Sequence, residues 1–173
     1  MGCAASCCWR KTWKGVTYDA AGDVESCVFC DIAAGRDFQD WRGLESDDLV
    51  AWFRSKAQDA EEHWLVVPRH HVRNINDTQL DADLLEHMVA VGQKLGDVLC
   101  FHIPPFNSID HLHLHAFRGD FRCLKEFKHW PSCWKCWTVS PEWVHTKLES
   151  QVVATARKGR SCSELGVMEQ KHR

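Results

Sequence analysis

Three histidines alternate with two leucines in the segment HLHLH. His111, His113 and His115 occupy every second position, with Leu112 and Leu114 between them. Because successive side chains of a β-strand point to opposite faces, this alternation predicts a strand with all three imidazoles on one face and both leucines in the core. In an α-helix, the same spacing would turn neighbouring histidines about 200° apart and disperse them. The pattern therefore predicts a cluster of imidazoles on one side of a sheet.

Clustered imidazoles suit two kinds of chemistry. A neutral imidazole can bind a transition metal, and it can also act as a nucleophile in covalent catalysis. Its attack on phosphorus gives a labile phosphoramidate, which suits a two-step transfer of a nucleotidyl group. Neighbouring imidazoles can donate hydrogen bonds to phosphoryl oxygens and carry the leaving-group proton near pH 7. The residues by themselves leave both uses open.

The ten cysteines of the chain include two C-x-x-C pairs. Cys27 and Cys30 have the spacing of metal ligands. Cys133 and Cys136 lack comparable partners, and we interpret them as strand packing. The chain starts MGCAASCC without the apolar run of a signal peptide, so the cysteines indicate a reducing, cytoplasmic compartment rather than a disulfide framework.

The first residues carry a second signal. Met-Gly-x-x-x-Ser is the pattern of N-myristoylation, which predicts a lipid at Gly2, and Cys3 is placed for palmitoylation. A single myristoyl chain binds membranes only marginally, so the second acyl group and the basic residues Arg10, Lys11 and Lys14 matter for anchoring. We therefore predict tethering to the cytoplasmic face of a membrane.

The length of 173 residues suits one domain with extensions. We expect a flexible N-terminal segment over 1–26, a folded domain over 27–149 and a loose polar tail over 150–173. A formal net charge of −3 provides no basic field for nucleic acid, and no stretch has the roughly 18 apolar residues of a membrane span. Predicted elements are a helical turn over 27–35, strands over 47–54, 63–68 and 134–139, a helix from Asp77 or Thr78 to about Val98, and a terminal helix over 141–150.

Several motifs together resemble a known family. HLHLH is preceded by FHIPPFNSID and, further upstream, by HWLVVPRHH and CVFCDI. This combination resembles the histidine triad (HIT) superfamily, in particular the histidine triad nucleotide-binding proteins of the human type-3 and plant type-4 branch. The similarity covers roughly residues 27 to 149. It implies an α+β fold with a central antiparallel sheet of about five strands, a long helix and a C-terminal helix, and a homodimer is usual among relatives.

The resemblance implies hydrolysis of adenosine 5'-monophosphoramidates, or related AMP conjugates, through an AMP-histidine intermediate. It assigns the nucleophile to His113, phosphoryl binding to His115, and support of the nucleophile to His63. Ser108 occupies the place from which relatives hydrogen-bond the phosphate or the leaving nitrogen, and Asn107 beside it is a further candidate. No metal is required for this chemistry, because preorganised hydrogen-bond donors stabilise the charge.

One position departs from the family pattern. Relatives end the strand before His63 with an Asp-Ile pair whose carboxylate grips the ribose hydroxyls, whereas Ser55 and Lys56 stand there in this chain. Asp59 replaces that carboxylate only if the loop is rearranged. We therefore expect weak adenosine selectivity, and a nucleotide-binding or scaffolding protein with weak or no turnover is the alternative function. DNA-adenylate repair, as in the aprataxin branch, is disfavoured because the chain lacks a basic surface and an appended zinc finger.

The resemblance also implies a metal centre. Several microbial relatives join the C-x-x-C pair to the histidine that ends Pro-x-x-His and to the first histidine of the triad. In this chain the four residues are Cys27, Cys30, His71 and His111, a ligand set for a closed, structural zinc site. His111 would then be unavailable as an acid or base. Two buried thiols beside two ordinary histidines remain the alternative.

Overall fold

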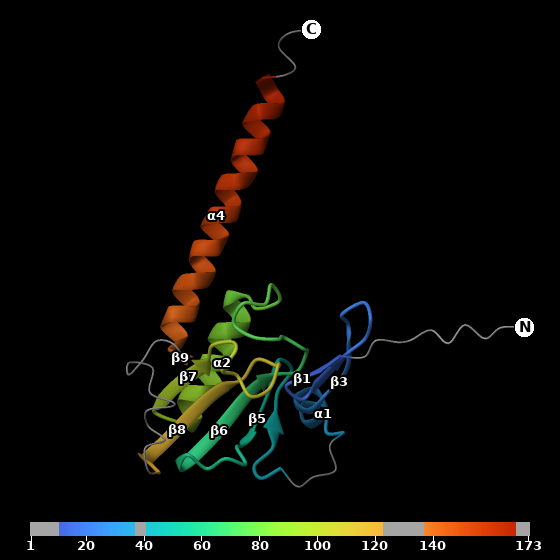
Figure 1. The fold of residues 1–173 in the computed structure, drawn as a ribbon. Coiled ribbons are helices and arrows are strands. Elements are labelled where there is room, and N and C mark those ends of the chain that lie inside the picture. The colour runs from blue at the N-terminus through green and yellow to red at the C-terminus, as the bar shows by residue number, and fades with distance from the viewer. Residues whose placement is uncertain (1–10, 37–40, 123–136, 169–173) are drawn as a thin grey trace, which may run out of the picture. The chain divides into compact units, whose positions relative to one another are not determined.

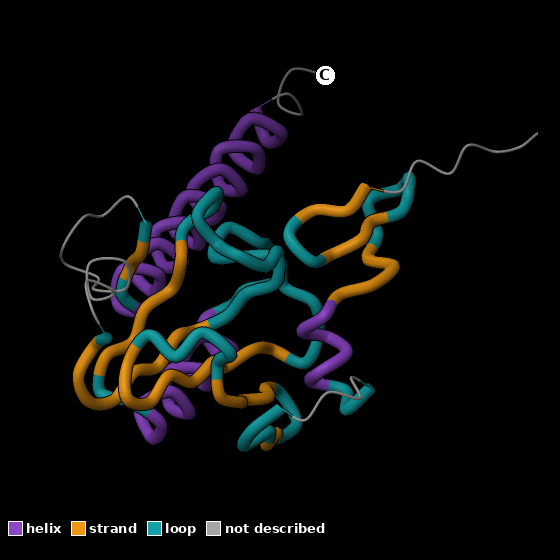
Figure 2. Tube along the Cα trace, turned by 60° about the horizontal axis from the view of Figure 1, so that its bottom comes forward, coloured by secondary structure: helices purple, strands orange, loops and turns teal. Residues whose placement is uncertain are grey.

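A computed structural model describes residues 11–36, 41–122 and 137–168. Its strands form two antiparallel sheets, one in the order β1-β2-β3 and the other in the order β4-β5-β6-β8-β7-β9 (Figures 1 and 2). The α+β class with a central antiparallel sheet is therefore confirmed. The strands are β1 (Lys11–Trp13), β2 (Val16–Tyr18), β3 (Val24–Cys27), β4 (Glu45–Ser46), β5 (Val50–Arg54), β6 (Ala60–Pro68), β7 (Val98–His102), β8 (Leu114–Phe121) and β9 (Thr138–Val139). The helices are α1 (Val28–Ala33), α2 (Ala82–Leu95) and α4 (Pro141–Met168).

The long helix α2 packs against β6 and β8, the central pair of the larger sheet. Its buried residues, among them Leu84, Leu85 and Met88, follow the three- and four-residue spacing of an amphipathic helix. The helix begins later than the predicted Asp77 or Thr78, because the Asp81 carboxylate accepts a hydrogen bond from the backbone N–H of Leu84 at 2.8 Å. Asp77 instead closes the preceding turn.

Residues 11–27 form the smaller sheet, so the expected flexible segment over 1–26 is wrong for this part. Lys14 and Gly15 both have positive φ, 46° and 72°, and form the two-residue turn between β1 and β2. Such a turn matches the twist of paired strands. Val16 and Tyr18 from β2 are buried in one core cluster with residues of α1, β5 and β6. Gly2 and Cys3 lie outside the described residues, and their acylation stays a prediction.

The terminal helix α4 runs to Met168, where a loose polar tail from residue 150 was expected. The prediction ended the helix early because residues 151–168 lack an apolar stripe, although many of them are good helix formers. Within the described ranges, no helix is both long and apolar enough to cross a bilayer. Cys133 and Cys136, and most of the strand predicted over 134–139, fall outside those ranges; its last two residues form β9.

Candidate active site and metal centre

The histidine segment is only partly a strand. Strand β8 begins at Leu114, so His111 and His113 precede it. The backbone N–H of Leu112 donates to the carbonyl of Val72 at 2.6 Å, outside the β6–β8 ladder. The prediction of one strand face carrying all three imidazoles is therefore wrong in part, and the side chains divide between two clusters. His111 lies with the cysteines, whereas His113 and His115 lie together with their ring centroids 5.0 Å apart.

His113 is held with one ring nitrogen fixed. Its Nδ1 lies 2.7 Å from the backbone carbonyl of His111, an acceptor, so Nδ1 carries the proton. Nε2 therefore holds the lone pair, and this atom is buried without a hydrogen-bond partner among the described residues. Burial lowers the pKa of His113 to about 4, which keeps the ring neutral at pH 7.

His63 and His115 form a second fixed pair across the β6–β8 ladder. The carbonyl of Ala57 accepts a hydrogen bond from Nδ1 of His63, so Nε2 of His63 is an acceptor. Nδ1 of His115 lies 2.8 Å from that Nε2 and must be the donor. A backbone carbonyl thus fixes the tautomers of both rings.

Sequence reasoning missed His102, at the end of β7. Its ring centroid lies 4.5 Å from that of His115 and 6.3 Å from that of His113, and the side chain is buried. Nitrogen atoms of these three histidines lie within 4.8 Å of one another. A single histidine in an apolar run gives no local signal. Only the pairing of β7 with β8, which sets Phe101 opposite Leu114, brings His102 to the cluster.

Of the two residues expected beside the phosphate, the structure brings Asn107 to His113 and leaves Ser108 apart. Asn107 is buried, and its side chain donates to the Ile109 carbonyl at 3.0 Å. Ser108 is exposed and does not line the small cavity at His113. That cavity is lined by Arg73, Asn74, His102, Asn107, His111, Leu112 and His113.

Ser55 lies at the His63 end of β6. Its backbone N–H donates to the His63 carbonyl at 2.8 Å, and the residue is buried. The carboxyl-bearing residue Asp59 is also buried, but its backbone is fixed at the start of β6, where its carbonyl accepts from the N–H of Arg122 at 2.9 Å. Ser55 and Asp59 therefore both lie near the start of β6, and the ribose-binding position stays a prediction for either residue.

The four predicted metal ligands come together. Nδ1 of His111 lies 3.3 Å from Sγ of Cys27 and 3.5 Å from Sγ of Cys30, and Nδ1 of His71 lies 3.6 Å from Sγ of Cys30. In a tetrahedral zinc site with ordinary bond lengths, sulfur and nitrogen ligands are about 3.6 Å apart. The distances thus fit a shared ion.

Tautomer and charge at this cluster also fit a cation. Nε2 of His111 lies 3.0 Å from the Pro68 carbonyl and must donate to it, so the lone pair on Nδ1 faces the sulfur atoms. The Cys30 thiol and the imidazoles of His111 and His71 lower the pKa of Cys27. A thiolate is the form that binds metal.

These features define a class of protein: an α+β domain in which a histidine cluster at an antiparallel sheet lies beside a Cys₂His₂ set. The family described as "Scavenger mRNA decapping enzyme C-term binding" matches residues 26–129. The chain belongs to the histidine triad superfamily.

Curated relatives agree with this assignment. The chain is 40% identical over 108 residues to the Arabidopsis thaliana protein named "Bifunctional adenosine 5'-phosphosulfate phosphorylase/adenylylsulfatase HINT4", covering 56% of this chain and 73% of that protein. It is 39% identical over 114 residues to the Mus musculus protein named "Adenosine 5'-monophosphoramidase HINT3", covering 59% of this chain and 66% of that one. A HIT family hydrolase from Legionella pneumophila Philadelphia 1 superposes with a TM-score of 0.51 and 27% identity, over 57% of this chain and 97% of the other.

Proposed function

We propose that this protein hydrolyses nucleoside 5'-monophosphoramidates, cleaving the P–N bond to release an amine and the nucleoside monophosphate, which is AMP for adenosine 5'-monophosphoramidates. The observation that carries the proposal is the orientation of His113. Its Nδ1–H is held by the His111 carbonyl, so the lone pair on Nε2 is the nucleophile. The name of the mouse relative, a monophosphoramidase, supports the same substrate class.

The reaction has two steps. Nε2 of His113 attacks phosphorus while the P–N bond breaks, and the leaving nitrogen takes a proton from a neighbouring protonated imidazole and departs as a neutral amine. Water then attacks the nucleotidyl-histidine and gives a proton back to that imidazole, which releases the nucleoside monophosphate and restores His113. His115 and His102 lie close enough to His113 for roles in phosphoryl binding and proton transfer, and His63 orients His115.

Detection of the covalent intermediate tests this mechanism. Brief incubation with an AMP-amide should place an adenylyl group on His113, identified by peptide mass spectrometry, and His113→Ala should abolish both adduct and turnover. His145→Ala is the matched control, because this histidine lies on α4 outside the histidine cluster. Absence of both turnover and adduct in the natural protein would overturn the enzymatic function. A binding protein with little turnover, favoured by Ser55 in the ribose position, would then be the better assignment.

We also propose that Cys27, Cys30, His71 and His111 hold a structural zinc ion. Support comes from the sulfur–nitrogen distances near those of a tetrahedral site, and from the Pro68 carbonyl that fixes the His111 tautomer. A bound zinc ion would link α1 to the segment after β6 and to the segment before β8. It takes no part in the chemistry at His113.

A further inference from the structure

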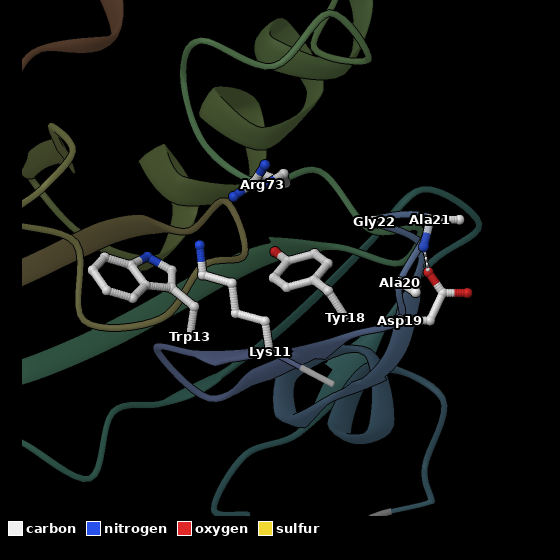
Figure 3. A pocket seen from close by; sticks show the side chains of 8 residues that line it. All are labelled: Lys11, Trp13, Tyr18, Asp19, Ala20, Ala21, Gly22 and Arg73. Atoms are coloured by element: carbon white, nitrogen blue, oxygen red, sulfur yellow. Dashed lines mark hydrogen bonds between the residues drawn. The ribbon is translucent and has the colours of Figure 1, made fainter. Parts of the chain in front are cut away.

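A cavity of about 420 Å³ lies against the small N-terminal sheet. Its wall is formed by Lys11, Trp13 and Tyr18 from β1 and β2, by the turn over 19–22, and by Arg73 (Figure 3). Arg73 also lines the small cavity at His113. Arg73 is therefore common to the two cavities, and we call the larger one the hairpin pocket.

The hairpin pocket is held in place relative to the catalytic residues. At the turn between β1 and β2, Nζ of Lys14 donates to the carbonyl of Asn107 at 2.6 Å and to its side-chain Oδ1 at 2.7 Å. The backbone N–H of Asp110 donates to the Lys14 carbonyl at 3.0 Å. The hairpin is thus tied to the loop that carries Asn107 to the cavity at His113.

Two cations, Lys11 and Arg73, lie on the wall of the cavity. The guanidinium of Arg73 donates to Oδ2 of Asp110 at 2.9 and 3.0 Å, which uses two of its five N–H donors, and its side chain is 54% exposed. Among described residues, no carboxylate lies within ion-pair distance of Nζ of Lys11. Asp19 also lines the pocket, but its Oδ1 accepts two backbone N–H bonds of the turn at 2.9 Å.

Aromatic rings stand next to these cations. Nζ of Lys11 and of Lys14 lie 5.9 and 5.6 Å from the ring centroid of Trp13, and the guanidinium of Arg73 lies 5.0 Å from that of Tyr18. Figure 3 shows Trp13, Lys11 and Tyr18 side by side, with Arg73 across from them. Trp13 is 47% exposed, so its ring is open to a ligand. Rings beside cations suit a planar group that carries a negative charge.

Ser55 lies beside the first half of β6, whereas Arg73 of the hairpin pocket follows the end of that strand. Ser55, which aligns with the ribose-binding residue of relatives, is bonded to His63 near the start of β6. Arg73 follows the end of the same strand, beyond Pro68. A substrate whose nucleoside lies near Ser55 and whose phosphorus lies at His113 would direct its leaving group toward Arg73.

We propose that the hairpin pocket binds the leaving group of the substrate and selects leaving groups that combine an aromatic ring with an anionic group. This inference rests on the proposed P–N hydrolysis, since the leaving group is the amine expelled from phosphorus when Nε2 of His113 attacks. Lys11 binds the anion, and Trp13 packs against the ring.

Three AMP-amides test the proposal, differing only in the amine: 4-(aminomethyl)benzoate, the neutral 4-(aminomethyl)benzamide, and aliphatic 5-aminopentanamide. We expect kcat/KM for the benzoate to exceed that for the benzamide about five-fold, the scale of one partly exposed charge pair. Lys11→Gln should remove this preference by lowering only the benzoate value. Trp13→Leu should lower both aromatic substrates relative to the aliphatic one. The control variant Lys94→Gln, an exposed lysine on α2, should leave all three values unchanged.

Equilibrium binding of the same compounds to the His113→Ala protein, with and without Lys11→Gln, separates this proposal from the proposed function. A Lys11-dependent preference for the benzoate supports the hairpin pocket even if the natural protein shows no turnover. Equal binding of benzoate and benzamide, or an equal loss of both on Lys11→Gln, overturns the hairpin pocket even if P–N hydrolysis is established. Loss of all binding in Lys11→Gln would show a general structural role and would also overturn it.

Discussion

Removal of the proposed zinc ion should destabilise the domain without unfolding it. The four ligands join three segments that are distant in the chain, so the ion stabilises the folded state and has no preformed site in the unfolded state. At free zinc about 1,000-fold above the dissociation constant, this linkage contributes about 4 kcal/mol. For a domain of this size, the loss corresponds to a fall in Tm of about 10–15 °C.

The structure explains why removal of the zinc ion should lower Tm without unfolding the domain. Without metal, the thiols and imidazoles still contact one another at 3.3 to 3.6 Å, so the buried polar atoms keep weak partners. The core beneath them, which includes Phe53 and Val67, and the contact of α2 with the large sheet do not depend on the ion.

Metal analysis and thermal unfolding provide the assay. Protein purified without chelator should contain one zinc per chain, and a chelator should lower Tm by the amount given above. Cys30→Ser should lose the metal and the chelator response. Cys100→Ala, which removes a buried thiol of β7 outside the ligand set, should keep both. A natural protein that contains no zinc, and whose Tm does not change when chelator is added, would refute the metal centre.

Three further predictions concern single substitutions, and a fourth concerns base selectivity. Ser55→Asp should raise kcat/KM for an AMP-amide about ten-fold, because a carboxylate accepts two hydrogen bonds from the ribose diol. The kcat/KM for a 2'-deoxy substrate should rise much less. An equal rise for both substrates would contradict the ribose position of Ser55. In the natural protein, AMP-amides and GMP-amides should be turned over at comparable rates. A strong preference for the AMP-amide would contradict the weak adenosine selectivity expected from Ser55. Gly96→Ala should lower the free energy of unfolding by about 1–3 kcal/mol in denaturant titrations, since its Cβ would lie 2.6 Å from the backbone of Phe117; an unchanged midpoint would show that the backbone yields. Gly2→Ala should release the protein from membranes on cell fractionation, and unchanged fractionation would reject N-myristoylation.

Elements with a strong repeating pattern could be predicted from the sequence. The apolar spacing of α2 and the branched and aromatic content of β5 and β6 each carry a local signal, because burial of one face imposes a period. The N-terminal hairpin has only three residues in each of its first two strands, too few to show a period. Its available signal was the Lys-Gly pair between Trp13 and Val16, a two-residue turn flanked by strand-forming residues.

The residues of the candidate site also divide into those that a sequence motif indicates and those that only the structure reveals. Cys27, Cys30, His63 and the histidine triad belong to motifs, and the sequence made them candidates. His102 and Lys14 were not assigned to the site, because their places depend on contacts between segments distant in the chain. Lys14 bonds Asn107, 93 residues away, and His102 reaches the cluster through a strand pairing. A lysine near the N-terminus is compatible with attraction to anionic lipids as well as with a hydrogen bond to a loop. The residue type of Lys14 therefore did not assign it to the site.

Backbone carbonyls explain how one short motif can supply both the proposed metal ligand and the proposed nucleophile. The Pro68 carbonyl takes the Nε2–H of His111 and leaves its lone pair on Nδ1, toward the cysteines. Two residues later, the carbonyl of His111 takes the Nδ1–H of His113 and leaves its lone pair on Nε2. The two rings thus expose opposite nitrogens, although both stand in the same alternating pattern. Alternation of histidine with leucine indicates a site, but the acceptor beside each ring determines which nitrogen can act. Because these acceptors are backbone atoms, the assignment depends on the end of β6 and the start of β8 rather than on further side chains.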